Sequence, residues 1–360
     1  MKEKINVTKT FLPDKQKFLR YIDQIWDSSV LTNQGPLLNE FEKRLKNFLN
    51  IENIQFLTNG TLPLQIAIRA LEIDGEIITT PFSYVATLSS ILWEKCHPVF
   101  ADIESDNFTI DANKIESLIT PKTKAILAVH CFGFPCDINK IESIAKKHNL
   151  KVIYDGAHAF GCEYLGKSLL SYGDISTCSF HATKLFHTIE GGAIIVNDDE
   201  INKKVDLIKR FGHIYDDHFS LGINAKASEF QSAMGLCNID YIDEIIANRK
   251  ISYEIYLNEL KDRFFIPKIS PNLKYNYGYF PILMNDENQL KELVLKLNNE
   301  NIFPRRYFFP SLNKLEYLEN KQNCPISENI ASKILCLPLY FNLNPQNITE
   351  ICKIINKTNL

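Results

Sequence analysis

A single lysine in a polar loop is the first candidate for chemistry in this sequence. Residues 174–196 read DISTCSFHATKLFHTIEGGAIIV, which predicts a strand, a loop that holds Ser179, Thr183 and Lys184, and a second strand after two glycines. A lysine amine is a useful nucleophile only when its pKa is lowered and its side chain is held in place. The two hydroxyls could bind a phosphate, and the glycines leave room for a ligand. Most lysines only solvate a surface, so other groups must support a reactive role for Lys184.

A carboxylate stands at the end of another apolar run. In KVIYDGAHAFG, residues 151–161, Asp155 comes directly after the predicted strand, and small residues follow it. A buried carboxylate is costly unless it is paired or hydrogen-bonded. Asp155 could therefore pair with a cationic nitrogen of a ligand, or it could cap a helix. His158 could contact the same ligand or lie in the core with its hydrogen bonds satisfied.

A third segment could bind an anion. After the apolar run IQFL comes TNGTLPLQIAIRAL, in which Gly60 allows a sharp turn, Thr61 could cap a helix and Pro63 suits the first helical turn. A helix N-terminus presents free N–H groups to an anion, and a plain capped helix would have the same sequence. The pattern G-x-x-x-x-G-K-[ST] is absent, which argues against a nucleotide-binding P-loop.

These three segments together are typical of a site for pyridoxal phosphate. That cofactor needs an anion site for its phosphate, a carboxylate beside its pyridine nitrogen and a lysine that forms a Schiff base with it. An aromatic ring over the pyridine would complete such a site. Tyr84, in TTPFSYVAT, is the candidate for that ring, and is otherwise an ordinary aromatic residue at a helix start.

The elements that must position these residues alternate along the chain. Between residues 50 and 200, short β-branched runs alternate with amphipathic helical patterns, which predicts an α/β fold with a large, mainly parallel sheet covered on both faces. Ligands of such sheets bind at the carboxyl ends of the strands. The expected strands before the lysine loop are residues 54–57, 76–80, 98–103, 124–130 and 151–155.

The pattern changes after about residue 236. A long helical stretch, residues 241–264, is followed by a strand in YGYFPILM, a helix in NQLKELVLKLNNENI and short mixed elements. We therefore expect a large domain, residues 1–240, and a smaller α+β domain, residues 241–360, with the first ~35 residues as a segment that could pack on the small domain.

Composition narrows the class of protein. The 360 residues are 45% hydrophobic and 23% charged with a net charge of −3, which gives no signal for nucleic-acid binding. No apolar run reaches the ~18 residues of a membrane span, and the N-terminus lacks a signal-peptide core. Nine cysteines without C-x-x-C or zinc-ribbon spacing predict reduced thiols, no metal site and a cytoplasmic location.

Over nearly its whole length the sequence resembles the sugar aminotransferases of the DegT/DnrJ/EryC1/StrS family. The most diagnostic segments are SFHATK and EGGA, supported by LTNQGPLLNEFEKRLKNFL, TNGTLPLQIAI, ITTPFSYVAT, PVFADIESDNFTID, VIYDGAHAFG and LGINAKASEFQSAMGL. The resemblance implies the aspartate aminotransferase fold (fold type I), pyridoxal phosphate as cofactor and L-glutamate as amino donor. It also implies a homodimer with two shared active sites.

The resemblance implies a role for each matching residue. Lys184 would form the Schiff base and transfer protons, and Asp155 would pair with the pyridine nitrogen. The other implied cofactor contacts are His158 beside the ring oxygen, Tyr84 stacked on the ring, Gly60, Thr61 and Ser179 at the phosphate, and Asn224 of the partner subunit, also at the phosphate.

Substrate contacts are expected in two places. The segment RRYFFP offers Arg305, Arg306 and Tyr307 for a sugar diphosphate, or it forms a surface edge of the small domain. Phe186, near Lys184, could line the sugar pocket. Lys226 stands where the family often has arginine, and a lysine would give a point charge in place of a bidentate fork.

Within the family, VTKTFLP, QIWDSSVLTNQGP and NIFPRRYFFPSL look most like the enzymes that aminate dTDP-4-keto-6-deoxy-D-glucose. Their product, dTDP-4-amino-4,6-dideoxy-D-glucose, serves surface polysaccharides such as lipopolysaccharide O-antigen. One alternative is amination at C3 of a dTDP-3-keto-6-deoxyhexose, which the sequence does not separate from the first. Another is a non-catalytic regulator that binds pyridoxal phosphate, and the presence of both Lys184 and Asp155 argues against it.

Overall fold

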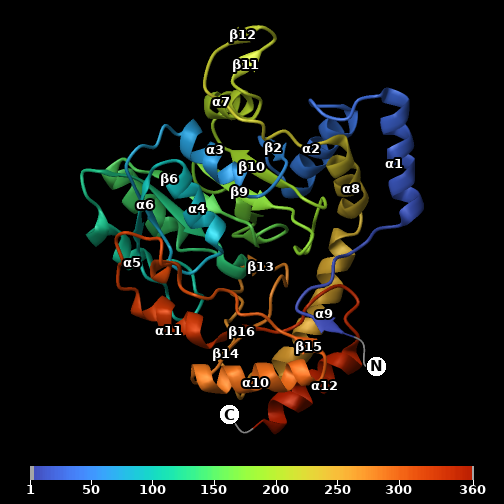
Figure 1. Cartoon of the computed structure of the whole chain (residues 1–360), viewed down its shortest axis with the longest axis vertical. Helices are drawn as coiled ribbons and strands as arrows, with labels where there is room; N and C mark the ends of the chain where they lie inside the picture. Colours follow the sequence, from blue (N-terminus) through green and yellow to red (C-terminus); the bar gives the residue numbers. More distant parts are fainter. Residues whose placement is uncertain (1–3, 359–360) are drawn as a thin grey trace.

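A seven-stranded sheet forms the centre of the larger part of the molecule (Figure 1). The computed structural model describes residues 4–358. Every neighbouring pair of strands is parallel except the two pairs made by β10, which runs antiparallel to β2 and β9. The predicted mainly parallel α/β sheet is therefore confirmed. In spatial order the strands are β2 (Ile54–Leu57), β10 (Gly192–Val196), β9 (Ile175–Ser179), β6 (Lys151–Asp155), β5 (Thr123–Val129), β3 (Glu76–Thr79) and β4 (His97–Phe100).

Helices cover both faces of this sheet. Successive strand residues point to opposite faces, and in β3 Ile77 and Ile78 accordingly belong to two different buried clusters. Because both faces are buried, the strands read as continuous apolar runs and not as alternating patterns. The helices on the Ile77 face are α3 (Leu62–Ala70), α4 (Val85–Trp93) and α7 (Asp199–Lys209). Those on the Ile78 face are α2 (Pro36–Leu49), α5 (Ala112–Ile115), α6 (Ile138–His148) and α8 (Glu229–Ile239).

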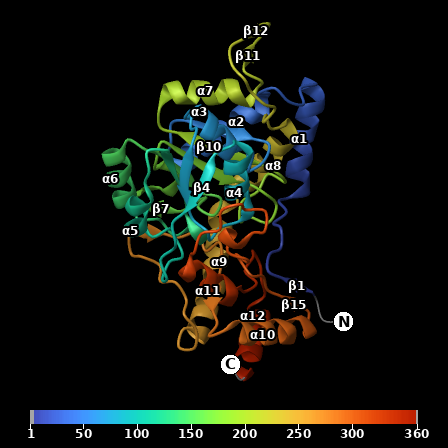
Figure 2. The same ribbon diagram turned by 60° about the vertical axis from the view of Figure 1, so that its left-hand side comes forward.

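A smaller group of elements lies below the sheet in Figures 1 and 2. Its helices are α9 (Ile242–Leu260), α10 (Glu287–Asn299), α11 (Pro325–Lys333) and α12 (Pro345–Lys357). Its short strands are β13 (Leu273–Lys274), β14 (Pro281–Leu283), β15 (Ile302–Phe303) and β16 (Ile334–Cys336). This mixture matches the α+β texture expected there, and the division at residue 240 stays a prediction.

The remaining elements are short. The N-terminal segment divides: β1 (Ile5–Asn6) pairs with β15 of the smaller group, whereas α1 (Lys15–Ser28) packs on α8. The first part of the predicted N-terminal segment therefore pairs with the predicted small domain, whereas α1 packs mainly on the predicted large domain and reaches the small one at Tyr241, beside Lys17. The other strands are β7 (Glu163–Tyr164), β8 (Lys167–Ser168), β11 (His213–Ile214) and β12 (Asp217–His218). Single 3₁₀ turns span Glu116–Leu118, Cys131–Gly133, Leu169–Ser171 and Leu312–Lys314.

The cysteines and helices bear on the expected class of protein. All nine cysteines are buried and free. Within residues 4–358 no helix is long and apolar enough to cross a membrane, and no group of three or more His, Cys, Asp and Glu side chains could hold a metal ion. The cytoplasmic location and the absence of a metal stay predictions.

One buried carboxylate joins the sheet to the smaller group. Asp102, just after β4, accepts hydrogen bonds from the backbone N–H groups of Ile326 (2.9 Å) and Ser327 (2.9 Å) in the first turn of α11. Those N–H groups have no partner inside the helix, so the carboxylate supplies one. Asp102 thereby fixes the start of α11 relative to the edge of the sheet.

We expect Asp102→Asn to lower the free energy of unfolding by about 1–3 kcal/mol, because the amide NH₂ would face an N–H donor and leave a buried group unpaired. Urea denaturation followed by circular dichroism measures the change. Asp106→Asn is the matched control, since it removes the same charge from an exposed position nearby. Equal midpoints for the two variants would contradict the proposed link.

Candidate active site

A cavity of about 340 Å³ opens at the carboxyl ends of the parallel strands. It lies between the sheet and the smaller group of elements, where such sheets bind ligands. The predicted residues that line it are Gly60, Thr61, Tyr84, Asp155, His158, Ser179, Lys184, Arg305 and Tyr307. The structure therefore brings together side chains that lie as far as 247 positions apart in the sequence.

Lys184 projects from the loop between β9 and β10. Hydrogen bonds from Phe180 N to Gly191 O (2.8 Å) and from Lys184 N to His181 O (2.8 Å) hold this loop. The amine Nζ donates to the hydroxyl of Tyr279 at 3.3 Å. Burial lowers the pKa of Lys184, and the negative charge of Asp155 opposes that shift. A lysine in this environment has the fixed position and the lowered pKa that nucleophilic or base chemistry needs.

Asp155 ends β6, with a side chain that is 5% exposed. Its Oδ1 accepts from Ala157 N (3.0 Å) and its Oδ2 accepts from the hydroxyl of Thr87 (2.8 Å). Burial raises the pKa of Asp155, while these two hydrogen bonds and the amine of Lys184 favour its charged form. A carboxylate oxygen accepts more than one hydrogen bond, so Asp155 can also accept from a cationic ligand nitrogen.

His158 presents a donor to the cavity. The backbone N–H of Phe132 donates to its Nδ1 at 3.2 Å, and burial lowers the pKa of the ring well below its ordinary value. The imidazole is therefore neutral, and because Nδ1 is an acceptor, Nε2 carries the proton. Phe308 stacks on the ring with centroids 5.5 Å apart and planes at 11°. This packing fixes the direction in which Nε2–H points.

The predicted anion site lies between the start of α3 and the end of β9. A Cβ atom on Gly60 would come within 2.7 Å of Ser179 Cβ and 2.8 Å of its Oγ, so only glycine allows this approach. The expectation that Thr61 caps α3 is wrong, because Asn59 Oδ1 accepts from Thr61 N and Leu62 N, both at 2.9 Å. The hydroxyl of Thr61 is thereby left to bind a ligand.

The described residues fit pyridoxal phosphate. The hydroxyls of Thr61 and Ser179 lie where a phosphate needs donors, Asp155 can face a pyridine nitrogen, and Lys184 supplies the amine. The Nε2–H of His158 can donate to a ring oxygen. Tyr84, the residue before α4, is 62% exposed, which leaves its ring accessible at the cavity wall.

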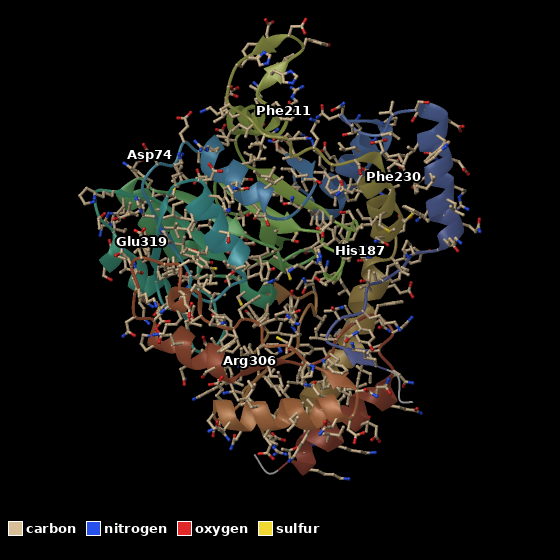
Figure 3. The ribbon with its side chains drawn as sticks, viewed as in Figure 1. Asp74, His187, Phe211, Phe230, Arg306 and Glu319 are labelled. Atoms are coloured by element: carbon tan, nitrogen blue, oxygen red, sulfur yellow. The ribbon has the colours of Figure 1, made fainter. Side chains whose placement is uncertain are left out.

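Two predicted substrate residues do not face this cavity. Arg306 does not line it: its guanidinium lies 3.4 Å from the ring centroid of Phe309 and pairs with Glu287 at 3.1 Å. Figure 3 shows Arg306 in the smaller group of elements. Phe186 is 1% exposed and stacks on Phe160 behind the lysine loop. Neither side chain lines the cavity, and Phe186 instead lines a small pocket beside Lys184.

Asn224 and Lys226 also lie outside the cavity of their own chain. Both follow the β11–β12 hairpin, which projects from the top of the molecule (Figure 2). Asn224 is exposed, and Lys226 Nζ lies 4.9 Å from the ring centroid of Phe211. Figure 3 shows Phe211 at the base of the hairpin.

The sequence did not reveal four contributors to the site. The side chain of Asn59 caps α3, and the hydroxyl of Thr87 donates a hydrogen bond to Asp155. The hydroxyl of Tyr279 accepts a hydrogen bond from Lys184, and Phe308 packs on His158. Thr87 carries a signal in hindsight, because a hydroxyl in the first turn of a helix that follows a strand can reach a neighbouring strand end. Tyr279 carries none, since YGYFPILM reads as a strand, whereas β14 begins only at Pro281.

Gly156 is required by its surroundings. A Cβ there would lie 2.3 Å from Leu170 Cδ2 and 2.8 Å from Thr177 O. The glycine lets the chain after Asp155 pass close to β9, and this approach holds the carboxylate at its place in the cavity.

Comparisons with known proteins identify the family of the chain. The profile of the DegT/DnrJ/EryC1/StrS aminotransferase family matches residues 13–356. The dTDP-4-amino-4,6-dideoxy-D-glucose transaminase of Shigella dysenteriae is 42% identical over 99% of this chain and 100% of its own length. The enzyme of the same name from Escherichia coli is 40% identical over 98% of each chain.

A solved structure supports the fold. DesI, determined in the presence of its TDP-sugar product, superimposes with a TM-score of 0.93 at 28% identity, over 99% of this chain and 93% of its own. The predicted aminotransferase fold is confirmed. The alternative of a non-catalytic regulator is wrong, because these relatives are transaminases that match the chain from end to end.

We expect Ser179→Ala to raise the dissociation constant of pyridoxal phosphate by about 10-fold or more, because a hydrogen bond to a charged group contributes ~1.5–3 kcal/mol. Titration of the cofactor-free protein, followed by absorbance, measures this. Ser176→Ala is the control: Ser176 Oγ donates to Tyr172 O at 2.9 Å in the same strand. Undiminished affinity in Ser179→Ala would place the phosphate elsewhere.

Proposed function

We propose that this chain, which belongs to the DegT/DnrJ/EryC1/StrS aminotransferase family, transfers an amino group from L-glutamate to C4 of dTDP-4-keto-6-deoxy-D-glucose. The products would be 2-oxoglutarate and dTDP-4-amino-4,6-dideoxy-D-glucose. The observation that carries the proposal is the 42% identity to a transaminase named for that product, over the full length of both chains. The amino sugar would enter a surface polysaccharide such as an O-antigen.

The residues of the cavity have the chemistry this reaction needs. When bound, pyridoxal phosphate supplies a cationic ring that takes up the electron pair released at the carbon beside the amino group. Asp155 holds the proton on the ring nitrogen, because a buried carboxylate beside a nitrogen favours its cationic form. His158 Nε2–H orients the ring by donating to its oxygen, and Tyr84 covers one face.

Lys184 moves the proton. Its amine would take the proton from the α-carbon of glutamate as a base and would return it, as an acid, to the cofactor carbon on the other side of the amino nitrogen. Burial lowers the pKa of Lys184, which favours the neutral amine that can act as the base. The keto sugar then enters the same cavity after 2-oxoglutarate has left.

The sugar nucleotide would enter past Arg305 and Tyr307. Arg305 is exposed at the cavity, and its guanidinium lies 6.0 Å from the ring centroid of Tyr307. Such a pair can bind a phosphate and pack against a sugar or a base. Arg306, turned toward Glu287, is not part of the proposed contact.

We also propose that two copies of the chain share their sites. Asn224 and Lys226 lie beside a projecting hairpin and outside the cavity of their own chain, so they could reach the phosphate and the substrate of a partner subunit. The neighbouring side chains Tyr215 and Leu221 are 91% and 81% exposed. Apolar groups exposed to that degree favour contact with another protein.

The first test is a product assay with pyridoxal phosphate, L-glutamate and either dTDP-4-keto-6-deoxy-D-glucose or its 3-keto isomer, with the product identified by NMR. We expect the 4-amino sugar. Lys184→Ala is the control and should give no product, because the base is lost. Formation of the 3-amino sugar alone would contradict the proposed substrate, but it would still agree with the proposed amino-group transfer.

A mixing experiment tests the shared site. Asn224→Asp would place a carboxylate beside the partner's cofactor phosphate, so we expect little activity from this variant or from Lys184→Ala alone. Mixed dimers contain one site with native Lys184 and native Asn224, and they should recover activity. If the mixture stays as inactive as its parts, Asn224 does not act across the interface.

A further inference from the structure

Among the described residues, the amine of Lys184 has one hydrogen-bond partner. That partner is not one of the residues to which the family resemblance gives a role. The hydroxyl of Tyr279 accepts from Lys184 Nζ at 3.3 Å. The ring of Tyr279 packs at a tilt on Phe132, with centroids 5.2 Å apart, and edge-on against His158 at 4.9 Å and Tyr307 at 5.9 Å. Three rings on three different segments therefore fix the hydroxyl in front of the amine.

The chain before Tyr279 is fixed from two sides. Asn276, which is fully buried, donates to His158 O and Phe160 O, both at 2.9 Å, and its own oxygen accepts from Gly278 N at 2.9 Å. Arg249 of α9 donates to Tyr277 O (3.0 Å) and Gly278 O (2.7 Å).

The hydrogen bonds from Asn276 and Arg249 fix the loop before Tyr279 more firmly than packing alone would. Burial lowers the pKa of Arg249 to about 10, so the guanidinium stays charged near neutral pH and its two hydrogen bonds are charge-assisted. Five hydrogen bonds thus hold the three residues before Tyr279, and they join this loop to the strand end that carries His158. A surface loop needs no such support.

We propose that Tyr279 is the positioning residue for Lys184: its hydroxyl accepts a hydrogen bond from Nζ and holds the displaced amine at the point from which it takes the proton of the donor. The inference rests on the proposed function, because it assumes that Lys184 is the base. Asn276 and Arg249 act through Tyr279 by fixing its backbone.

The charges around Lys184 determine in which direction the pKa of its amine shifts. Groups that face the amine are Asp155 at the end of β6, Cys178 in β9, Tyr84 before α4, Tyr307 after β15 and His158 beyond β6. These groups are unchanged when only the Tyr279 hydroxyl is removed.

An acceptor that bonds the ammonium form favours that form, so its loss lowers the pKa of Lys184. Burial raises the pKa of Tyr279 above its ordinary value, and the hydroxyl is therefore protonated and acts through its lone pair. The base must be neutral to accept a proton. The rising limb of the pH–rate profile should consequently move to lower pH when the hydroxyl is lost.

The test is Tyr279→Phe, which keeps the ring and its packing. In a single-turnover reaction of the cofactor-loaded protein with L-glutamate, followed by absorbance, we expect proton transfer to slow by about tenfold or more, as for loss of a charge-assisted hydrogen bond. The primary isotope effect with α-deuterated glutamate should be larger than in the native protein, because the proton-transfer step becomes more rate-limiting.

A second readout uses the cofactor-free full chain. Acetylation of Lys184 by acetic anhydride, measured by mass spectrometry against pH, gives the pKa of the amine without any turnover. We expect a lower pKa in Tyr279→Phe, hence faster labelling at neutral pH although catalysis is slower. A purely structural defect would not produce these opposite changes.

Tyr277→Phe is the matched control, since it removes a hydroxyl from the same loop and leaves the Tyr279 hydroxyl in place. Native labelling and a native rising limb in Tyr279→Phe would overturn the proposal. So would equal changes in the two variants. Failure of the native protein to react with L-glutamate would instead contradict the proposed function, and the labelling comparison would still decide whether Tyr279 controls Lys184.

Discussion

The site depends on keeping a carboxylate and an amine together in one cavity, where both are shielded from water by the protein. Each group alone would be costly to bury in its charged form. Asp155 is supported by a backbone N–H and by the hydroxyl of Thr87, and Lys184 by the hydroxyl of Tyr279. Burial pushes the pKa of the amine down and that of the carboxylate up, while each charge opposes the shift of the other. This balance favours the neutral form of the amine and lets the carboxylate keep the charge that can stabilise a cation.

Such a balance is useful only if the groups stay in place, and the surrounding packing provides that. Phe132 and Phe308 stack at 5.9 Å with planes at 12°, and Phe308 also stacks on His158. These rings come from the sheet side and from the segment after β15. The segment is in turn fixed where Leu312 N donates to Pro81 O at 2.7 Å, beyond β3. Because protein cores are packed almost without voids, a shift of either part would disturb the whole wall.

Sequence patterns predicted the parts of the site that local chemistry determines. The strand ranges 54–57 and 151–155 agree with β2 and β6, and Asp155 could be recognised because a carboxylate directly after a buried run is unusual. Arg305 and Arg306 could not be separated, since both have the same chemistry. Arg305 forms an isolated bridge with Cys336, and in extended backbone successive side chains point to opposite sides, so one reaches the cavity and the other reaches Glu287. The role of Tyr279 could not be predicted from the sequence, because its position depends on Asn276 and Arg249, which bind the loop from distant parts of the fold.

The distribution of positive charge supports the proposal that two copies of the chain share their sites. Among the described residues, the lysines and arginines that line the cavity are Lys184 and Arg305, whereas the proposed cofactor phosphate and sugar diphosphate together carry several negative charges. In the proposed reaction Lys184 transfers protons, which leaves Arg305 to bind the anionic groups. Lys226 follows the β11–β12 hairpin, beside Phe211, and lies outside the cavity of its own chain. A second copy that buried the exposed Tyr215 and Leu221 would gain apolar contact area and could bring Asn224 and Lys226 to the anionic end of the site. The same contact would then stabilise the assembly and supply the missing charge.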